Sequence, residues 1–159
     1  MKQKLYLETT IVSYLTAWPS HGLIRAGEQQ LTRDWWEMRS AFELYVSQFV
    51  LDEAAAGASD AAQRRLEALS EAALLGLTPE ARLLAGEIVR LGGMPVNAQM
   101  DASHVAVAAV HGMDYLLTWN CAHIANATLR GRIEAICRET GFEPPIICTP
   151  RELMEEEPS

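Results

Sequence analysis

Cysteine is scarce in this sequence, and the few cysteines present match neither a disulfide framework nor a metal cage. There are three, Cys121, Cys137 and Cys148. Their number is odd and no pair has the spacing of a zinc ligand motif, which argues against a cross-linked secreted domain and against a zinc site. We therefore expect three free thiols.

Positive charge is also in short supply. Thirteen Lys and Arg stand against 21 Asp and Glu, which gives a net charge of −8. Phosphate contacts need basic side chains, so this balance argues against a broad nucleic-acid-binding surface. Part of the acidic excess lies in the segment 152–157, and we expect residues 155–159 to form a disordered acidic tail.

Long apolar runs are missing as well. No stretch approaches the roughly 18 to 20 apolar residues that a membrane span needs. The opening MKQKLYLETT has no apolar signal segment or cleavage site. A length of 159 residues with 49% hydrophobic residues is typical of one folded unit with its own core. We expect a single domain over residues 1–154, a cytoplasmic location and no membrane association.

Strand-like and helix-like apolar patterns alternate along the chain. The predicted strands lie at residues 4–7, 42–47, 73–77, 113–119 and 146–148. The predicted helices follow residue 8 and then lie at 25–40, at 50–69 with a break at Gly57, at 79–90, from Asn97 toward Gly112, at about 121–139 and after Pro150. Because parallel strands need crossover helices, this alternation predicts an α/β sandwich with a mainly parallel sheet.

Three helix starts carry a capping signal. Thr78 followed by Pro79 predicts a cap and a first helical residue. Ser59 or Asp60 is the expected cap of the helical piece after the glycine break, and Asn97 is the expected cap of the next long helix.

Four acidic or amide residues stand where a strand ends or a helix begins: Glu8, Glu53, Asp101 and Asn120. Ligands of parallel α/β sheets bind beyond the carboxyl ends of the strands. Carboxylates there can hold one or two Mg²⁺ or Mn²⁺ ions, which supply what phosphodiester hydrolysis needs. The pattern therefore predicts a metal-dependent phosphodiesterase in which the three carboxylates bind metal and Asn120 completes the site.

Each of these positions also has a structural interpretation. A carboxylate at Asp101, in a first helical turn, is favourable without any metal because it meets the helix dipole, and Glu53 could simply face solvent. Glu8 is different, since a charged residue between a buried strand and an apolar helix is costly unless it is paired or bound. We expect His104, three residues after Asp101, to be structural.

In their order and spacing these segments resemble the PIN-domain family, which includes the VapC-like toxins of bacterial and archaeal toxin-antitoxin pairs. YLETTIVSYL is similar to the opening strand of the family with its acidic residue, VLDE to the second acidic motif, MDASHVAVAA to the third and LLTWN to the fourth. The resemblance covers nearly the whole chain. It is closest to a branch with a TWNxxHIAN stretch, found here at residues 118–126.

The resemblance implies a three-layer α/β/α sandwich with a parallel five-stranded sheet. It also implies an endoribonuclease that depends on Mg²⁺ or Mn²⁺, with RNA as substrate and an antitoxin protein as a partner. The catalytic positions of the family fall on Glu8, Glu53, Asp101 and Asn120, and metal binding falls on the three carboxylates.

Two of these positions depart from the family pattern. Glu8 replaces the usual Asp and is longer by one methylene, whereas Asn120 keeps an oxygen but loses a negative charge, so a second metal should be held less tightly. Thr9 matches the hydroxyl position of the pattern beside the first acidic residue, and Thr118 lies just before the fourth position. We expect both, together with His123, to contact the substrate.

Two alternatives stay open. A non-catalytic PIN module that binds RNA or a protein partner would explain Asn120, Glu8 and the acidic surface. A different α/β hydrolase acting on a small phosphate ester is less well supported, since there is no Gly-rich phosphate loop or nucleophile elbow. Separately, the hydrophobic Trp35-Trp36 region and the Ala-rich helices suggest a homodimer.

Overall fold

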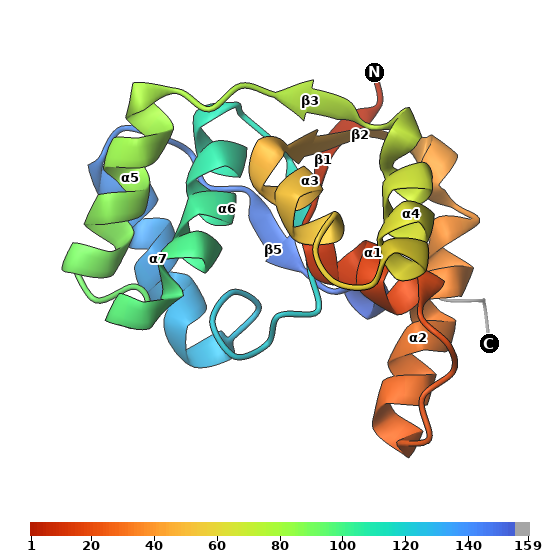
Figure 1. Cartoon of the computed structure of the whole chain (residues 1–159). Helices are drawn as coiled ribbons and strands as arrows, with labels where there is room; N and C mark the ends of the chain where they lie inside the picture. The colour runs from red at the N-terminus through yellow and green to blue at the C-terminus, as the bar shows by residue number, and fades with distance from the viewer. Residues whose placement is uncertain (155–159) are drawn as a thin grey trace.

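A five-stranded sheet with only parallel pairings forms the centre of the protein (Figure 1). The computed structural model describes residues 1–154, so the predicted tail at 155–159 lies outside the described residues. The strands are β1 (Gln3–Leu7), β2 (Phe42–Ser47), β3 (Ala73–Leu75), β4 (Tyr115–Leu117) and β5 (Ile146–Cys148). Their order is β3-β2-β1-β4-β5, which places a topological switch point at the central strand β1.

Helices cover the sheet and complete the predicted α/β/α sandwich. They are α1 (Thr9–Thr16), α2 (Leu23–Trp36), α3 (Gln48–Ala54), α4 (Ser59–Ala68), α5 (Pro79–Arg90), α6 (Gln99–Val110) and α7 (Ala127–Glu139). Figure 1 shows α5, α6 and α7 gathered on one side, and α1, α2 and α4 on the other. No helix within residues 1–154 is long and apolar enough to cross a membrane.

The apolar core lies where the central strands and α6 meet. Leu5, Leu7, Leu116 and Leu117 are all fully buried, as expected of strands covered on both faces. Helix α6 is buried nearly all round, because its many alanines allow it to pack closely against neighbouring elements. The polar residues at the ends of these elements are therefore held on a rigid frame.

The five predicted strands are present and differ from the prediction only in length. Residues 42–47 and 146–148 agree at both ends, and β1 begins one residue earlier than predicted. The other two strands are shorter than the ranges 73–77 and 113–119, because their ladder pairings cover only the residues of β3 and β4.

Helix α5 confirms its predicted boundaries. The Thr78 hydroxyl accepts a hydrogen bond from the Ala81 backbone N–H at 3.1 Å, and Pro79 occupies the first helical position. The chain leaves the helix through Gly92, whose φ of +78° lies in the left-handed region that favours glycine.

Two other capping predictions are wrong. Helix α4 begins at Ser59 itself, and neither Ser59 nor Asp60 is its cap; the cap position is Ala58, which has no side chain to bond. Asn97 lies in a 3₁₀ turn, Val96–Ala98, that runs directly into α6. In this turn the Ala98 N–H donates to the Pro95 carbonyl at 2.9 Å, and the chain enters α6 without a side-chain cap.

Helix α7 begins at Ala127 rather than at about Cys121. Residues 121–125 form turns, because the Asn126 side chain offers the backbone an alternative to helix. Its amide donates to the carbonyls of Cys121 at 3.1 Å and Ala122 at 3.0 Å, while its oxygen accepts from the Thr128 N–H at 2.9 Å. Asn126 thus holds the turns and caps the helix.

Helix α2 occupies residues 23–36 rather than the predicted 25–40. After Trp36 the chain forms a 3₁₀ turn, Arg39–Ala41, and the Arg39 guanidinium donates to the Trp36 carbonyl at 2.9 Å. Trp35 is fully buried, packed against Trp36 and Phe42. It therefore provides no exposed surface for the homodimer that the Trp35-Trp36 pair had suggested.

The cysteines are free thiols, as predicted. Cys121 is exposed, whereas Cys137 and Cys148 are buried. Burial raises the pKa of the Cys137 thiol to about 11 and that of the Cys148 thiol to about 12, so both stay protonated and unreactive at neutral pH.

The capping difference between α5 and α4 can be measured. Thr78→Ala removes the only side-chain cap of α5 and is expected to lower the free energy of unfolding by about 1 kcal/mol. Ser59→Ala serves as the matched control, because Ser59 caps nothing, and is expected to leave stability nearly unchanged. Urea unfolding of both variants measures the effect; equal losses would contradict the assignment of the caps.

Candidate metal centre

The residues expected to share a site come from four elements at the carboxyl end of the sheet. Glu8 follows β1 and is the N-cap residue of α1, and Glu53 lies near the end of α3, which begins directly after β2. Asp101 lies in the first turn of α6, and Asn120 comes after β4. The alternation of strands and helices thus brings distant parts of the chain to one edge.

The Glu8 carboxylate is buried, with 4% of the residue exposed, and one of its oxygens is held by several donors. Oε1 accepts hydrogen bonds from the Thr118 hydroxyl at 2.6 Å, from the Thr10 backbone N–H at 3.2 Å and from the Thr10 hydroxyl. These bonds offset the cost of burying the charge.

The other oxygen of Glu8 is available. Oε2 has no hydrogen-bond partner within residues 1–154. It is also absent from the fully buried unpaired polar atoms of those residues, which are Trp35 Nε1 and Arg130 Nε. Glu8 Oε2 is therefore both unpaired and open to the surroundings, as a metal ligand must be.

The Glu53 carboxylate, on α3, also has one oxygen held by donors and one oxygen available. Its Oε1 accepts a hydrogen bond from the Thr9 hydroxyl at 2.7 Å and lies 2.6 Å from His104 Nε2. Within the described chain its Oε2 has no partner, and 38% of the side chain is exposed. Partial burial raises the pKa of the Glu53 carboxyl, but the hydrogen bonds from His104 and Thr9 bring it below its ordinary value. The group is ionised at neutral pH.

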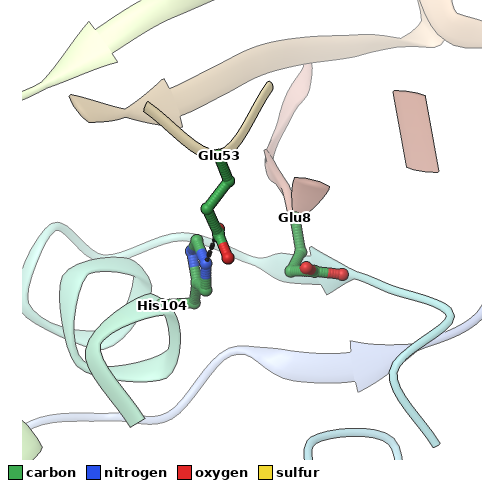
Figure 2. A group of neighbouring side chains, drawn as sticks. All are labelled: Glu8, Glu53 and His104. Carbon is green, nitrogen blue, oxygen red and sulfur yellow. Dashed lines mark hydrogen bonds and ion pairs between the residues drawn. The ribbon is translucent and has the colours of Figure 1, made fainter. Parts of the chain in front are cut away.

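Glu8, Glu53 and His104 form a compact group (Figure 2). Each offers one potential ligand atom, and these atoms all lie within 4.8 Å of one another. Figure 2 shows the Glu53 carboxylate directed at the His104 ring, with the Glu8 carboxylate beside them. Two carboxylates with unpaired oxygens are the hard ligands that Mg²⁺ and Mn²⁺ prefer, so the residues present fit a divalent cation.

Asp101 and Asn120 lie outside this compact group. Asp101 Oδ2 is instead 2.8 Å from His123 Nδ1, and 22% of the Asp101 side chain and 31% of the His123 side chain are exposed. Asn120 Oδ1 accepts from the His123 backbone N–H at 3.0 Å, and the Asn120 N–H donates to the Thr118 hydroxyl at 2.9 Å. The Asn120 side chain therefore builds the turn that presents His123.

The threonine hydroxyls hold the carboxylates in place. The sequence predicts that Thr9 and Thr118 contact the substrate. In the structure the Thr9 hydroxyl donates to Glu53 and the Thr118 hydroxyl donates to Glu8. Thr10 was not predicted from the sequence as a site residue, yet both its N–H and its hydroxyl donate to Glu8. Its place two residues after an acidic N-cap was the available signal, since a capping side chain accepts from the N2 or N3 backbone N–H.

His104 is the second residue that sequence reasoning did not place at the site. It is fully buried, and its Nδ1 lies 2.7 Å from the Tyr6 hydroxyl while Nε2 contacts Glu53. The signal was a histidine in the middle of an otherwise apolar helix, because a polar group buried there requires partners.

Comparison with known proteins agrees with this fold. The PIN domain family model matches residues 6–120, and the chain belongs to this family. The protein has the fold of a chain in the crystal structure of VapBC2 from Rickettsia felis bound to a DNA fragment from their promoter. The TM-score is 0.56 at 15% identity, and the alignment covers 92% of this chain and 98% of that one. No curated protein matches the sequence.

The lowered pKa of Glu53 leads to a pH dependence of stability. A carboxyl whose pKa falls on folding stabilises the protein above its ordinary pKa, and this stabilisation is lost as pH falls through the lowered value. Glu53→Gln should therefore cost stability at pH 7 and cost less, or nothing, at pH 3. Urea unfolding in EDTA at both pH values measures this.

Asp52→Asn is the matched control for this measurement. Asp52 lies beside Glu53 on α3, but within residues 1–154 its carboxylate accepts a single, exposed hydrogen bond, from Gln48. A Glu53→Gln variant whose cost does not change between the two pH values, or changes no more than that of the control, would contradict the assignment.

Proposed function

We propose that this PIN domain protein is a metal-dependent endoribonuclease. The observation that carries the proposal is the pair of prearranged carboxylates, Glu8 and Glu53. Each has Oε1 held by side-chain donors and Oε2 without a partner among residues 1–154. A Mg²⁺ or Mn²⁺ ion bound there would stabilise charge on the scissile phosphate and activate a water for attack. Membership of the PIN family supports the same chemistry.

Asp101 is the proposed third carboxylate ligand. It stands on α6 one turn before His104, and its only side-chain partner among the described residues is His123. In this proposal Asp101 would hold the cation together with Glu8 and Glu53. An approach to the cation is favourable because two carboxylates alone leave most coordination positions to water.

His123 and Asn120 are proposed to face the substrate. His123 Nε2 has no partner within residues 1–154, and 31% of the side chain is exposed, so the ring can contact a phosphate. Asn120 contributes by holding the backbone of His123. Thr9 and Thr118 would orient the two carboxylates, and the direct substrate contact expected from the sequence stays a prediction.

A toxin-like role with an antitoxin partner is part of the proposal. It is supported by the family and by the structural likeness to a VapBC protein. An apolar surface suited to a protein partner is present where α1 leads into α2: Trp18, Leu23 and Ile24 are 81%, 89% and 81% exposed. The homodimer and the cytoplasmic location stay predictions.

The alternative function is a non-catalytic module that binds RNA or a protein. The pairing of Asp101 with His123, away from Glu8 and Glu53, favours it, since it leaves two carboxylates rather than three in the compact group. Metal titration separates the two functions. Absence of Mn²⁺ binding at millimolar concentration would favour the module.

The catalytic proposal is tested by incubating the protein with single-stranded and structured RNA in Mn²⁺ or Mg²⁺. Cleavage should stop in EDTA. Glu8→Gln, Glu53→Gln and Asp101→Asn should each slow cleavage about 100-fold or more, which corresponds to about 2.7 kcal/mol of lost transition-state stabilisation. Asp52→Asn, exposed on α3, should leave the rate unchanged. Equal cleavage by wild type and the site variants would rule out these residues as the catalytic centre.

A further inference from the structure

A buried chain of polar side chains runs from the sheet to Glu53. The Ser47 hydroxyl lies 2.8 Å from the Tyr6 hydroxyl, which lies 2.7 Å from His104 Nδ1, and His104 Nε2 lies 2.6 Å from Glu53 Oε1. Ser47, Tyr6 and His104 are all fully buried. They come from β2, β1 and α6, so the chain links three elements of the core to the candidate metal centre.

The hydrogen-bond directions along this chain are consistent with one another. Burial raises the pKa of the Tyr6 hydroxyl, so Tyr6 keeps its proton and can donate it to His104 Nδ1. His104 then carries its proton on Nε2 and donates it to the Glu53 carboxylate, while Ser47 donates to the Tyr6 oxygen. A fully satisfied network of this kind holds its members in one orientation.

The imidazole ring is also held by its aromatic neighbours. Tyr6 and Phe49 contact it edge-on, with ring centroids 5.8 Å and 6.2 Å away. With a partner on each nitrogen and an aromatic ring against it on two sides, His104 has one available position. Glu53, in contrast, is partly exposed near the end of a short helix and relies on its hydrogen bonds for orientation.

We propose that His104 is a positioning residue that fixes the Glu53 carboxylate for the divalent cation without binding the ion itself. This rests on the proposed cation site at Glu8 and Glu53. His104 forms its hydrogen bond with Glu53 Oε1 (Figure 2), so Glu53 Oε2 remains available to the ion. If Nε2 bound the ion instead, it would have to give up the 2.6 Å contact with Glu53 and keep its proton on Nδ1, which reverses every bond in the chain to Ser47.

The first test is Mn²⁺ affinity, measured by calorimetry with Mn²⁺ alone. In His104→Asn the side chain is too short to reach Glu53, and the Kd is expected to rise about 10-fold or more, as for other residues that orient metal ligands. In His104→Gln the amide can place a donor near the position of Nε2, and the Kd is expected to stay within about threefold of wild type. A Kd for His104→Asn equal to that of wild type, or a Kd for His104→Gln as weak as that of His104→Asn, would overturn the proposal.

A second variant keeps the test decisive if His104→Asn does not fold. Tyr6→Phe preserves the ring and removes the hydroxyl that holds His104 Nδ1, and a several-fold rise in the Mn²⁺ Kd is expected. Tyr45→Phe is the matched control on the adjacent strand, since the Tyr45 hydroxyl has one partner among the described residues, the exposed Glu43. An unchanged Kd in Tyr6→Phe would overturn the proposal.

Pulsed EPR of bound Mn²⁺ separates positioning from ligation. A positioning role predicts no nitrogen coupling that depends on His104. A nitrogen coupling present in wild type and lost in His104→Gln would identify His104 as a ligand and overturn the proposal.

These measurements are independent of RNA cleavage. If Mn²⁺ binding responds to the variants as expected but no RNA is cut, the nuclease function fails and the role of His104 stands. If RNA is cut but His104→Asn binds Mn²⁺ as tightly as wild type, the role of His104 fails and the nuclease function stands. If wild type does not bind Mn²⁺ at all, both fail.

Discussion

The burial of one carboxylate, that of Glu8, is the constraint on which the rest of the site depends. Glu8 directly follows the central strand β1. Its backbone N–H donates to the Leu117 carbonyl at 3.1 Å, so the β1-β4 pairing continues to this residue. Its side chain then binds the hydroxyls of Thr10 and Thr118 from the two sides of that pairing. The same Thr10 hydroxyl accepts from the Trp119 N–H at 2.8 Å. The start of α1 and the end of β4 are therefore joined through the carboxylate.

The two oxygens of each carboxylate have different roles in this arrangement. In Glu8 and in Glu53 one oxygen serves the fold, by accepting hydroxyl or imidazole donors, and the other has no partner among the described residues. The two carboxylates each place an oxygen within 4.8 Å of the other, so their charges repel, and a divalent cation relieves that repulsion. The hydrogen bonds of the protein thus form a site that favours the binding of a cation before the ion arrives.

Much of this could be predicted from the sequence, because it depends on patterns that are local in the chain. Alternating apolar segments predicted the five parallel strands, and the Thr78-Pro79 pair predicted the start of α5. Glu8 comes directly after one strand, and Glu53 lies on the short helix that follows the next. These positions predicted that the two side chains meet at one edge of the sheet, since the carboxyl ends of parallel strands lie together.

The remainder depends on contacts between distant segments, which local patterns do not contain. His104 meets Tyr6 and Glu53 only because α6 packs against β1 and α3 with one particular alignment. The late start of α7 depends on an Asn126 side chain that bonds backward as well as forward. The pairing of Asp101 with His123 likewise requires the turn that Asn120 stabilises.

The most direct test of the central claim is a crystal structure of the protein soaked in Mn²⁺, with anomalous scattering used to locate the ion. The account predicts an anomalous peak within about 2.0 to 2.6 Å of Glu8 Oε2 and Glu53 Oε2, with both Oε1 atoms still bonded to their threonine donors. No peak at these oxygens, or a peak bound only by Asp101 and His123, would contradict it.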